Sequence, residues 1–225
     1  MTRLSRDFFA RPAADVAHDL VGCVIVRDDV RLRIVETEAY AGDDSACHAF
    51  RGMTPRTAPL FGPPGHAYIY LCYGIHTMLN LVAGVDGVAA GVLIRAAEVV
   101  GGDDVVKARR GRAPDATLDA AICSGPGKVG AALGLSTASS GTDICAGEFL
   151  AVHTGSAPRL VVSGPRVGID FASAEDIARP WRFADADSRA VSQRRTLSMT
   201  PTNSTPNSTT KKPPPKISAK KKTAT

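Results

Sequence analysis

Alternating apolar and polar residues predict several strands joined by tight turns. Two runs, residues 23–27 and 31–40, are separated by a pair of aspartates, which is typical of a β-hairpin. A second pair of runs, residues 66–73 and 77–83, is separated by a turn that contains glycine. Further strand-like runs lie at residues 88–96, 149–153 and 160–169.

Proline, glycine and charged residues mark the ends of a few short helices. Residues 12–20 begin at a proline and end before a glycine, whereas residues 103–110 run from acids to bases and stop at a glycine. Two more helical stretches are predicted at residues 116–122 and 124–134. Together with the strands, they predict an α+β fold: a single compact domain with a strand-rich antiparallel core, a protruding β-hairpin and short surrounding helices.

The strand at residues 31–40 combines two carboxylates with an aromatic ring. Successive side chains of a strand point to opposite faces, so one face is predicted to carry Ile34, Glu36, Glu38 and Tyr40. An acid two residues from an aromatic ring can contact the same small molecule, which suggests the floor of an active site. The alternative is a strand with an acidic outer face that pairs with Arg31 or Arg33.

Tyrosines gather on the second predicted hairpin. Tyr68, Tyr70 and Tyr73 lie within eight residues, and the fourth tyrosine of the chain is Tyr40. Such rings often belong to the core or to a sheet surface. However, Tyr73 lies at the turn, where its ring suits a wedge inserted between base pairs from the minor groove. Tyr70 and Tyr40 would then stack on an extruded base.

Two other motifs carry potential chemistry. His48 lies in the long loop 41–65, a length that often indicates function, but no second ligand pair is near enough in sequence to predict a zinc site. Residues 124–128 resemble a phosphate loop only superficially, because Ile122 and Val129 occupy its first and last positions. This segment predicts a helix start with Lys128 beside it that binds one DNA phosphate, or a helix capped by Ser124.

The net charge of +5 is concentrated at the C-terminal end. The last 25 residues hold six of the 27 basic residues and none of the 22 acidic ones, so the first 200 residues carry 21 basic against 22 acidic residues. We therefore expect a folded domain at residues 1–195 and a disordered, basic, Thr/Ser/Pro/Lys-rich tail at residues 196–225. This tail is either an arm that adds salt-dependent affinity for nucleic acid or an inert extension.

Cysteine usage and apolar runs suggest where the protein works. The five cysteines are widely spaced and form no Cys-x-x-Cys pair, which argues against a disulfide framework and a cysteine-rich zinc site. No apolar run has the length of a signal peptide core or a membrane span. We expect a cytoplasmic, nucleoid-associated protein without membrane contact.

Several motifs occur in the order found in one enzyme family. Over residues 4–192 the chain resembles the alkyladenine (3-methyladenine) DNA glycosylases, through residues 33–40, residues 68–74 with Asn80, and residues 93–96, 123–128 and 165–168. The resemblance implies that residues 1–195 form the catalytic domain of a base-excision repair glycosylase. It also implies flipping of alkylated or deaminated purines, of the 3-methyladenine, 7-methylguanine, ethenoadenine and hypoxanthine class, and hydrolysis of the N-glycosidic bond to leave an abasic site.

The resemblance assigns a role to each motif residue. Glu38 matches the general base that activates water, and Arg95 helps to hold that water and a nearby phosphate. Tyr40, His48 and Tyr70 match the pocket walls, Asn80 crowds the exocyclic amine of guanine, and Tyr73 fills the space of the flipped nucleotide. DNA backbone contacts are expected from Thr54, Arg56, Ser124 and Lys128. No metal or organic cofactor is implied, the partner is double-stranded DNA with a damaged purine, and we expect a monomer.

Departures from the family pattern concern substrate range more than reaction type. His76 stands where an aromatic or apolar neighbour of the wedge is expected, and the loop before His48 is one residue shorter. Neither Lys107 nor Lys128 lies in a candidate site motif, so no amine nucleophile is available for a lyase and a monofunctional enzyme is expected.

Two other functions fit parts of the pattern. A non-catalytic module could stack its tyrosines on unpaired bases and use the basic tail for affinity, without any need for Glu38. A sugar glycosidase could use Glu36 and Glu38 as its carboxylate pair. The single tryptophan, Trp181, leaves that second alternative without aromatic platforms for a sugar.

Overall fold

Two twelve-residue strands, β2 (Val30–Ala41) and β5 (Ala90–Gly101), form the centre of the sheet and pair in antiparallel fashion along nearly their whole length. The computed structural model describes residues 1–201, with side chains as far as residue 197. On one side of this centre lie β4 (His76–Val82) and then β3 (Ala67–Cys72). On the other lie β8 (Arg182–Asp185), β7 (Val161–Gly164) and β9 (Ser198–Pro201). The first half of β2 also pairs with β1 (Val24–Arg27), which pairs with β6 (Ala151–His153).

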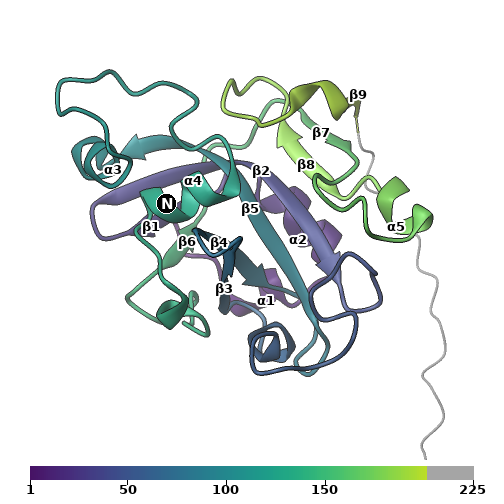
Figure 1. The fold of residues 1–225 in the computed structure, drawn as a ribbon. Coiled ribbons are helices and arrows are strands. Elements are labelled where there is room, and N and C mark those ends of the chain that lie inside the picture. The colour runs from purple at the N-terminus through teal and green to yellow at the C-terminus, as the bar shows by residue number, and fades with distance from the viewer. Residues whose placement is uncertain (202–225) are drawn as a thin grey trace, which may run out of the picture.

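Short helices surround this curled sheet (Figure 1). The α-helices are α1 (Arg6–Phe9), α2 (Ala13–Leu20), α3 (Asp103–Arg109), α4 (Pro126–Ala132) and α5 (Ala174–Ala178). Three short 3-10 turns are η1 (Ala58–Phe61), η2 (Thr137–Ser139) and η3 (Arg194–Thr196). The prediction of a single α+β domain with an antiparallel core is confirmed.

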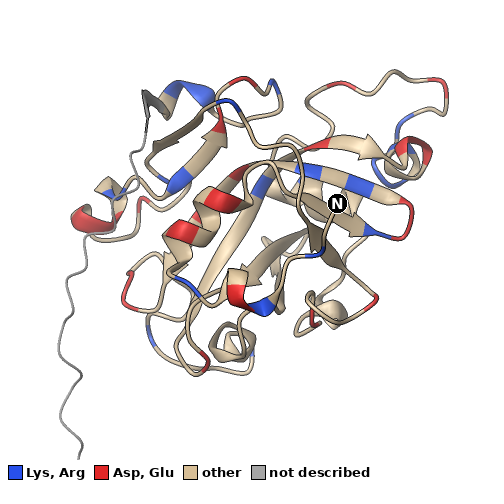
Figure 2. Ribbon diagram, turned by 180° about the vertical axis from the view of Figure 1, so that it is seen from behind, with Lys and Arg blue, Asp and Glu red and all other residues tan. Residues whose placement is uncertain are grey.

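Helix α2 closes the main core against the centre of the sheet. Its fully buried Val16, Ala17 and Leu20 lie on one helical face, as the i, i+1, i+4 spacing requires. The Thr37 hydroxyl on β2 also donates a 2.7 Å hydrogen bond to the Ala17 carbonyl. Seen from behind, acidic segments mark α2 while basic and acidic positions are interspersed over the neighbouring elements (Figure 2). Because Thr37 points toward α2, this helix covers the face of β2 opposite to the one that carries Glu36 and Glu38.

A β-bulge in β2 interrupts the alternation of side chains that the sequence predicted. Ile34 pairs with Ala97 and Glu36 with Ala96, so Val35 is an extra residue in the ladder. Ile34 consequently packs in the main core, whereas Val35 packs in a second cluster with Val162 and Ala184. The prediction that Ile34 shares the face of Glu36 and Glu38 is therefore wrong, because the bulge shifts the alternation by one residue.

Most predicted elements appear near their predicted positions, with two exceptions. Residues 116–119 have no regular structure and residues 120–122 form a turn instead of a helix, with the Ile122 N–H bonded to the Asp119 carbonyl. The predicted strand at residues 160–169 ends at Gly164, where proline follows and cannot donate to the ladder. Strand β8 was not predicted, because four residues that include an arginine and an aspartate show no alternation.

The predicted tail begins at residue 196, but Thr196 belongs to η3 and residues 198–201 form β9. The rest of the tail, residues 202–225, lies outside the described residues, so its disorder and its role stay predictions. Within residues 1–201, the helices are too short and too polar to cross a membrane.

Two glycines let α4 lie directly on β4. A Cβ added to Gly130 would lie 2.1 Å from the Thr77 carbonyl oxygen, and one added to Gly127 would lie 2.9 Å from the His76 side chain. Since α4 packs on the second strand of the β3–β4 hairpin, this close approach holds the hairpin in place. His76, which departs from the family pattern, thus packs against α4.

We expect Gly130→Ala to destabilise the fold by about 1–3 kcal/mol, because the helix must move away from β4. Urea denaturation measures this change. Gly62→Ala is the control, since its added Cβ would meet nothing nearer than 3.3 Å at a φ of −80°. Equal stability of the two variants would contradict the close packing.

Candidate active site

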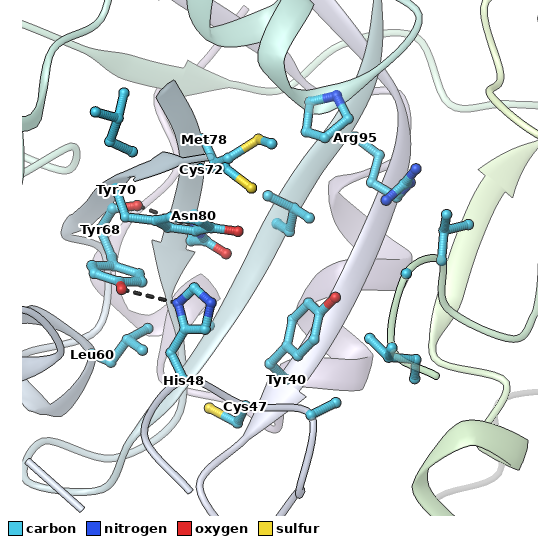
Figure 3. Close-up of a pocket in the computed structure, with 18 of the residues that line it drawn as sticks. Tyr40, Cys47, His48, Leu60, Tyr68, Tyr70, Cys72, Met78, Asn80 and Arg95 are labelled. Atoms are coloured by element: carbon cyan, nitrogen blue, oxygen red, sulfur yellow. Dashed lines mark hydrogen bonds between the residues drawn. The ribbon is translucent and has the colours of Figure 1, made fainter. Parts of the chain in front are cut away.

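A cavity of about 450 Å³ opens beside the β3–β4 hairpin. Its wall includes residues from the ends of β2 and β5, from the loop after β2 and from the segment around Gly168 (Figure 3). Ligand sites in proteins commonly have this size. Of the predicted pocket residues, Tyr40, His48, Tyr70 and Asn80 all line it, as do Arg95, Arg56 and Tyr73. The fold therefore gathers into one cavity residues that are far apart in sequence.

Glu38 lies just behind the wall of this cavity. Its side chain is completely buried and accepts hydrogen bonds from the Val167 N–H at 2.7 Å, the Tyr40 hydroxyl at 2.8 Å and Arg95 Nη1 at 3.3 Å. These three donors line the cavity, whereas Glu38 itself does not. A carboxylate offers about four acceptor positions, so one acceptor position on Oε1 is left for a small molecule such as water.

Burial raises the pKa of the Glu38 carboxyl above its ordinary value. Arg95, the Val167 N–H and the Tyr40 hydroxyl act in the opposite direction, because each stabilises the carboxylate. Burial beside Glu38 also raises the pKa of Tyr40 far above its usual value, so Tyr40 remains a hydroxyl donor. The site thus holds an ionisable carboxyl that is basic for its type yet supported by three donors.

Arg95 joins Glu38 to the second carboxylate of the strand. Its Nε donates to Glu36 at 3.1 Å, while its Nη1 donates to Glu38. Glu36 is completely buried and also accepts from Arg182 at 3.2 Å and from the Ser192 N–H at 2.7 Å. The alternative of an acidic outer face paired with Arg31 or Arg33 is wrong, because both carboxylates are completely buried and pair with Arg95 and Arg182 instead. Because Glu36 is buried and paired with both Arg95 and Arg182, it is also unsuited to be the second acid of a sugar glycosidase.

Aromatic rings form two facing walls of the cavity. The His48 and Tyr70 rings meet edge to face with centroids 4.5 Å apart, and Tyr70 stacks on Tyr68 at 5.4 Å. Tyr40 stands on the other side of the opening (Figure 3). Loss of water around the ring, together with nearby Arg56, lowers the pKa of His48. A neutral imidazole that shares a 3.1 Å hydrogen bond with the Tyr68 hydroxyl therefore completes this wall at neutral pH.

Asn80 lies at the inner end of the cavity. Its side chain is buried, and its amide donates to the Tyr68 carbonyl oxygen at 3.3 Å. Strand β4 sets this position by pairing Asn80 with Leu93 of β5, another cavity residue. A rigid strand thus presents the Asn80 amide to whatever enters the cavity.

The tip of the β3–β4 hairpin presents Tyr73 to solvent. This ring is 91% exposed, and the neighbouring Ile75 is 72% exposed. Tyr73 and Gly74 both have positive φ, at 50° and 73°, and the Ile75 N–H bonds to the Cys72 carbonyl. A type I′ turn has this geometry, and positive φ is uncommon for a tyrosine. The turn therefore holds an apolar ring away from the body, beside the cavity mouth.

Of the four residues expected at the DNA backbone, Arg56 lines the cavity. The Arg56 guanidinium lies 5.5 Å from the Tyr70 ring centroid, and Thr54 forms turn bonds with Thr57. Lys128 donates to the Ala121 carbonyl oxygen at 2.9 Å. The alternative that Ser124 caps α4 is wrong, because the N-cap is Gly125 and no side chain caps this helix. DNA contact by these four residues stays a prediction.

Comparison with known proteins identifies the family to which this arrangement belongs. The sequence model named Methylpurine-DNA glycosylase (MPG) matches residues 7–189. The chain belongs to the methylpurine-DNA glycosylase family. The resemblance found in the sequence motifs is thereby confirmed.

Relatives of this family match over most of their length. The chain is 48% identical over 199 residues to "Putative 3-methyladenine DNA glycosylase" of Methanocella arvoryzae, covering 86% of this chain and 98% of the relative. It is also 48% identical over 193 residues to "DNA-3-methyladenine glycosylase" of Arabidopsis thaliana, covering 85% and 75%. A third relative, named like the first, comes from Nitrosococcus oceani and is 46% identical over 191 residues, covering 84% and 93%.

The structure adds site residues that the sequence did not reveal in this family member. Val167 contributes through its backbone N–H, which no side-chain motif can indicate. Arg182 and Ser192 reach the site through Glu36. For Arg182, the only sign in the sequence of a buried position is that it stands between Trp181 and Phe183. Among residues 1–197, no group of three or more His, Cys, Asp or Glu side chains is placed to hold a metal ion.

Proposed function

We propose that this protein is a base-excision repair enzyme that flips a damaged purine out of DNA and hydrolyses its N-glycosidic bond with a water activated by Glu38. Membership of the methylpurine-DNA glycosylase family gives the coarser activity, that of a 3-methyladenine DNA glycosylase. The observation that carries the proposal is a buried carboxylate with three donors, directly behind an aromatic cavity of 450 Å³.

The flipped purine enters between Tyr40 on one side and His48 with Tyr70 on the other. Stacking of a base on an aromatic side chain contributes roughly 1–3 kcal/mol. Alkylation makes the purine cationic or electron-poor, so electron-rich ring faces favour it over an undamaged base. Asn80 at the inner end selects further, because its fixed amide crowds an exocyclic group that points toward it.

Hydrolysis then needs one water on Glu38. The free acceptor position of Oε1 accepts an O–H of this water, at the junction of Tyr40, Arg95 and Val167. The water oxygen forms a bond to the deoxyribose C1′ while the bond from C1′ to the base nitrogen breaks, and the electron pair leaves with the base. Glu38 takes the water proton, and the products are the free base and an abasic site with a C1′ hydroxyl. A cationic alkylated purine leaves as the neutral base, whereas hypoxanthine leaves as an anion that takes a proton from water.

The groups around Glu38 keep its carboxyl ionised, so that it can accept the proton of the water. Arg95 and the Val167 N–H stabilise the carboxylate form that must accept the proton. Alkylated purines leave readily, so the site needs little acid catalysis of its own. The preferred lesion among 3-methyladenine, 7-methylguanine, ethenoadenine and hypoxanthine depends on how each edge meets Asn80 and His48.

Tyr73 is proposed to occupy the space that the flipped nucleotide leaves in the duplex. Its exposed ring at the tip of a rigid turn resembles the apolar wedges that other proteins insert between base steps. Thr54, Arg56, Ser124 and Lys128 would bind phosphates on either side, which positions the lesion without reading sequence.

Release of free base from a panel of lesion-bearing duplexes tests the proposal. The wild-type protein is expected to release at least one damaged purine and to leave an alkali-labile abasic site. The competing function, a non-catalytic module that stacks tyrosines on bases, predicts tight binding to the same duplexes without any release. That second outcome would contradict the proposal.

A further inference from the structure

Glu36 is a buried charge that the proposed hydrolysis does not use directly. Its side chain is completely buried, and burying an unpaired carboxylate is strongly unfavourable. It accepts four hydrogen bonds: from Arg95 Nε, from Arg182 Nη1, and from both the N–H and the hydroxyl of Ser192 at 2.7 and 3.0 Å. Since Glu36 does not line the cavity and all four of these bonds come from other groups of the protein, any effect of Glu36 on the reaction acts through these partners.

Arg95 is held by all three of its guanidinium nitrogens. Nε donates to Glu36 at 3.1 Å, Nη1 to Glu38 at 3.3 Å and Nη2 to the Ser192 hydroxyl at 3.3 Å. A long side chain with one partner would choose among many rotamers, whereas three fixed bonds leave it a single orientation. Two of the three bonds come from Glu36 and Ser192, so these residues decide how Arg95 meets Glu38.

Arg182 ties this arrangement to the segment after β8. Its completely buried guanidinium donates to Glu36 and also to the carbonyl oxygens of Ser192 and Gln193, both at 3.4 Å. It further donates to the Thr196 hydroxyl at 2.6 Å. Residues 192–196 are thus joined by three hydrogen bonds to Arg182, which itself bonds Glu36. These residues follow the family match, which ends at residue 189.

We propose that Glu36, Arg182 and Ser192 form a positioning clamp for Arg95, and that the segment from Ser192 to Thr196 therefore completes the active site. The clamp rests on the proposed function, because its effect on the reaction passes through Glu38. None of its members touches the substrate; they fix the direction from which Arg95 supports the general base.

Ser192→Ala tests the clamp with little disturbance of the fold. The substitution removes the hydroxyl that bonds both Glu36 and Arg95, while the backbone N–H on Glu36 remains. Single-turnover release of hypoxanthine from duplex DNA is expected to slow about 10-fold at neutral pH, since a hydrogen bond to a charged group is lost. Ser192→Thr keeps a hydroxyl and is expected to restore most of the rate.

The pH profile separates positioning from a general structural effect. The charged and titratable groups around Glu38 are Glu36 and Tyr40 on β2, Arg95 on β5, Arg182 on β8, and Arg166, whose guanidinium lies 4.8 Å from the Tyr40 ring centroid. Because a well-oriented Arg95 lowers the pKa of Glu38, loosening it moves the rising limb of the profile to higher pH. We expect Ser192→Ala to show this shift.

Ser188→Ala is the matched control on the same stretch of chain. Ser188 is also buried, but its hydroxyl donates to Glu98 and makes no contact with Arg95. It is expected to keep the wild-type rate and profile. A Ser192→Ala protein that melts like wild type and keeps the wild-type rate and profile would overturn the clamp.

A second variant covers the case in which Ser192→Ala does not fold. Thr196→Val removes the hydroxyl that holds Arg182, and a wild-type rate and profile there as well would overturn the attachment of the segment. Glu38→Gln distinguishes failure of the clamp from failure of the proposed function. If Glu38→Gln abolishes release while Ser192→Ala changes nothing, only the clamp is wrong; if Glu38→Gln keeps full activity, the proposed function is wrong.

Discussion

Replacing Glu38 by glutamine is expected to slow single-turnover base release by roughly 10²-fold to 10⁴-fold, the usual contribution of a positioned general base. Glutamine has nearly the same shape, but its single side-chain oxygen replaces only one of the two carboxylate oxygens, which the Val167 N–H and the Tyr40 hydroxyl bond separately. What is lost is the ability to take a proton from water. Quantification of free base from a lesion duplex at saturating protein measures the effect.

Binding is expected to survive this substitution. The aromatic walls formed by Tyr40, His48 and Tyr70 do not depend on the charge of Glu38, so the affinity for lesion duplex should stay close to that of the wild type. Glu98→Gln is the matched control, because that carboxylate lies on the same sheet but bonds Arg33 and Ser188 away from the cavity. A Glu38→Gln protein that releases base at the wild-type rate would remove Glu38 from the mechanism.

Tyr73→Ala is expected to have the next largest effect. If the ring fills the space of the flipped nucleotide, its loss removes a stacking contribution of roughly 1–3 kcal/mol, which corresponds to about 5-fold to 150-fold in the flipping equilibrium. Tyr73→Phe keeps the ring and is expected to retain most of the activity. Fluorescence of 2-aminopurine placed opposite or beside the lesion reports flipping directly.

Because Tyr73 is exposed, its replacement should affect DNA flipping without affecting the stability of the fold. A ring that is 91% exposed packs against little in the free protein, so the substitution should leave the melting temperature unchanged. Val85→Ala changes another exposed apolar residue, 68% exposed and on a different turn, and controls for general loss of surface hydrophobicity. Wild-type flipping and release by Tyr73→Ala would refute the wedge.

The sequence predicted the elements whose signals are local. The hairpins around residues 28 and 74 follow from alternation and turn residues, and helices α2, α3 and α4 follow from their end signals. Glu38 and Tyr40 stood out because they lie two residues apart in one strand motif, and Tyr70 stood out because it belongs to the tyrosine-rich hairpin. The structure adds that these motifs meet around one cavity, since β2, β3, β4 and β5 are neighbours in the sheet.

The remainder depends on contacts between distant residues. Val167 lies in the motif at residues 165–168, but it acts through its backbone N–H, a role that a side-chain pattern does not reveal. Ser192 reaches Glu36 across 156 positions of sequence, so no local pattern marks it. The bulge at Val35 is set by pairing with β5, because the sequence alone is compatible with regular alternation. Arg182 was overlooked since a lone arginine in a short run normally lies at the surface.

The pH dependence of hypoxanthine release by wild type and Glu38→Gln tests the central claim most directly. Glu38 must be ionised to accept the water proton, and burial raises its pKa, so the wild-type rate should rise with pH through a value above the ordinary glutamate pKa and then level off. Glu38→Gln should lack this rising limb entirely. A wild-type rate that does not change with pH over this range, or the same limb in Glu38→Gln, would contradict the assignment of Glu38 as general base.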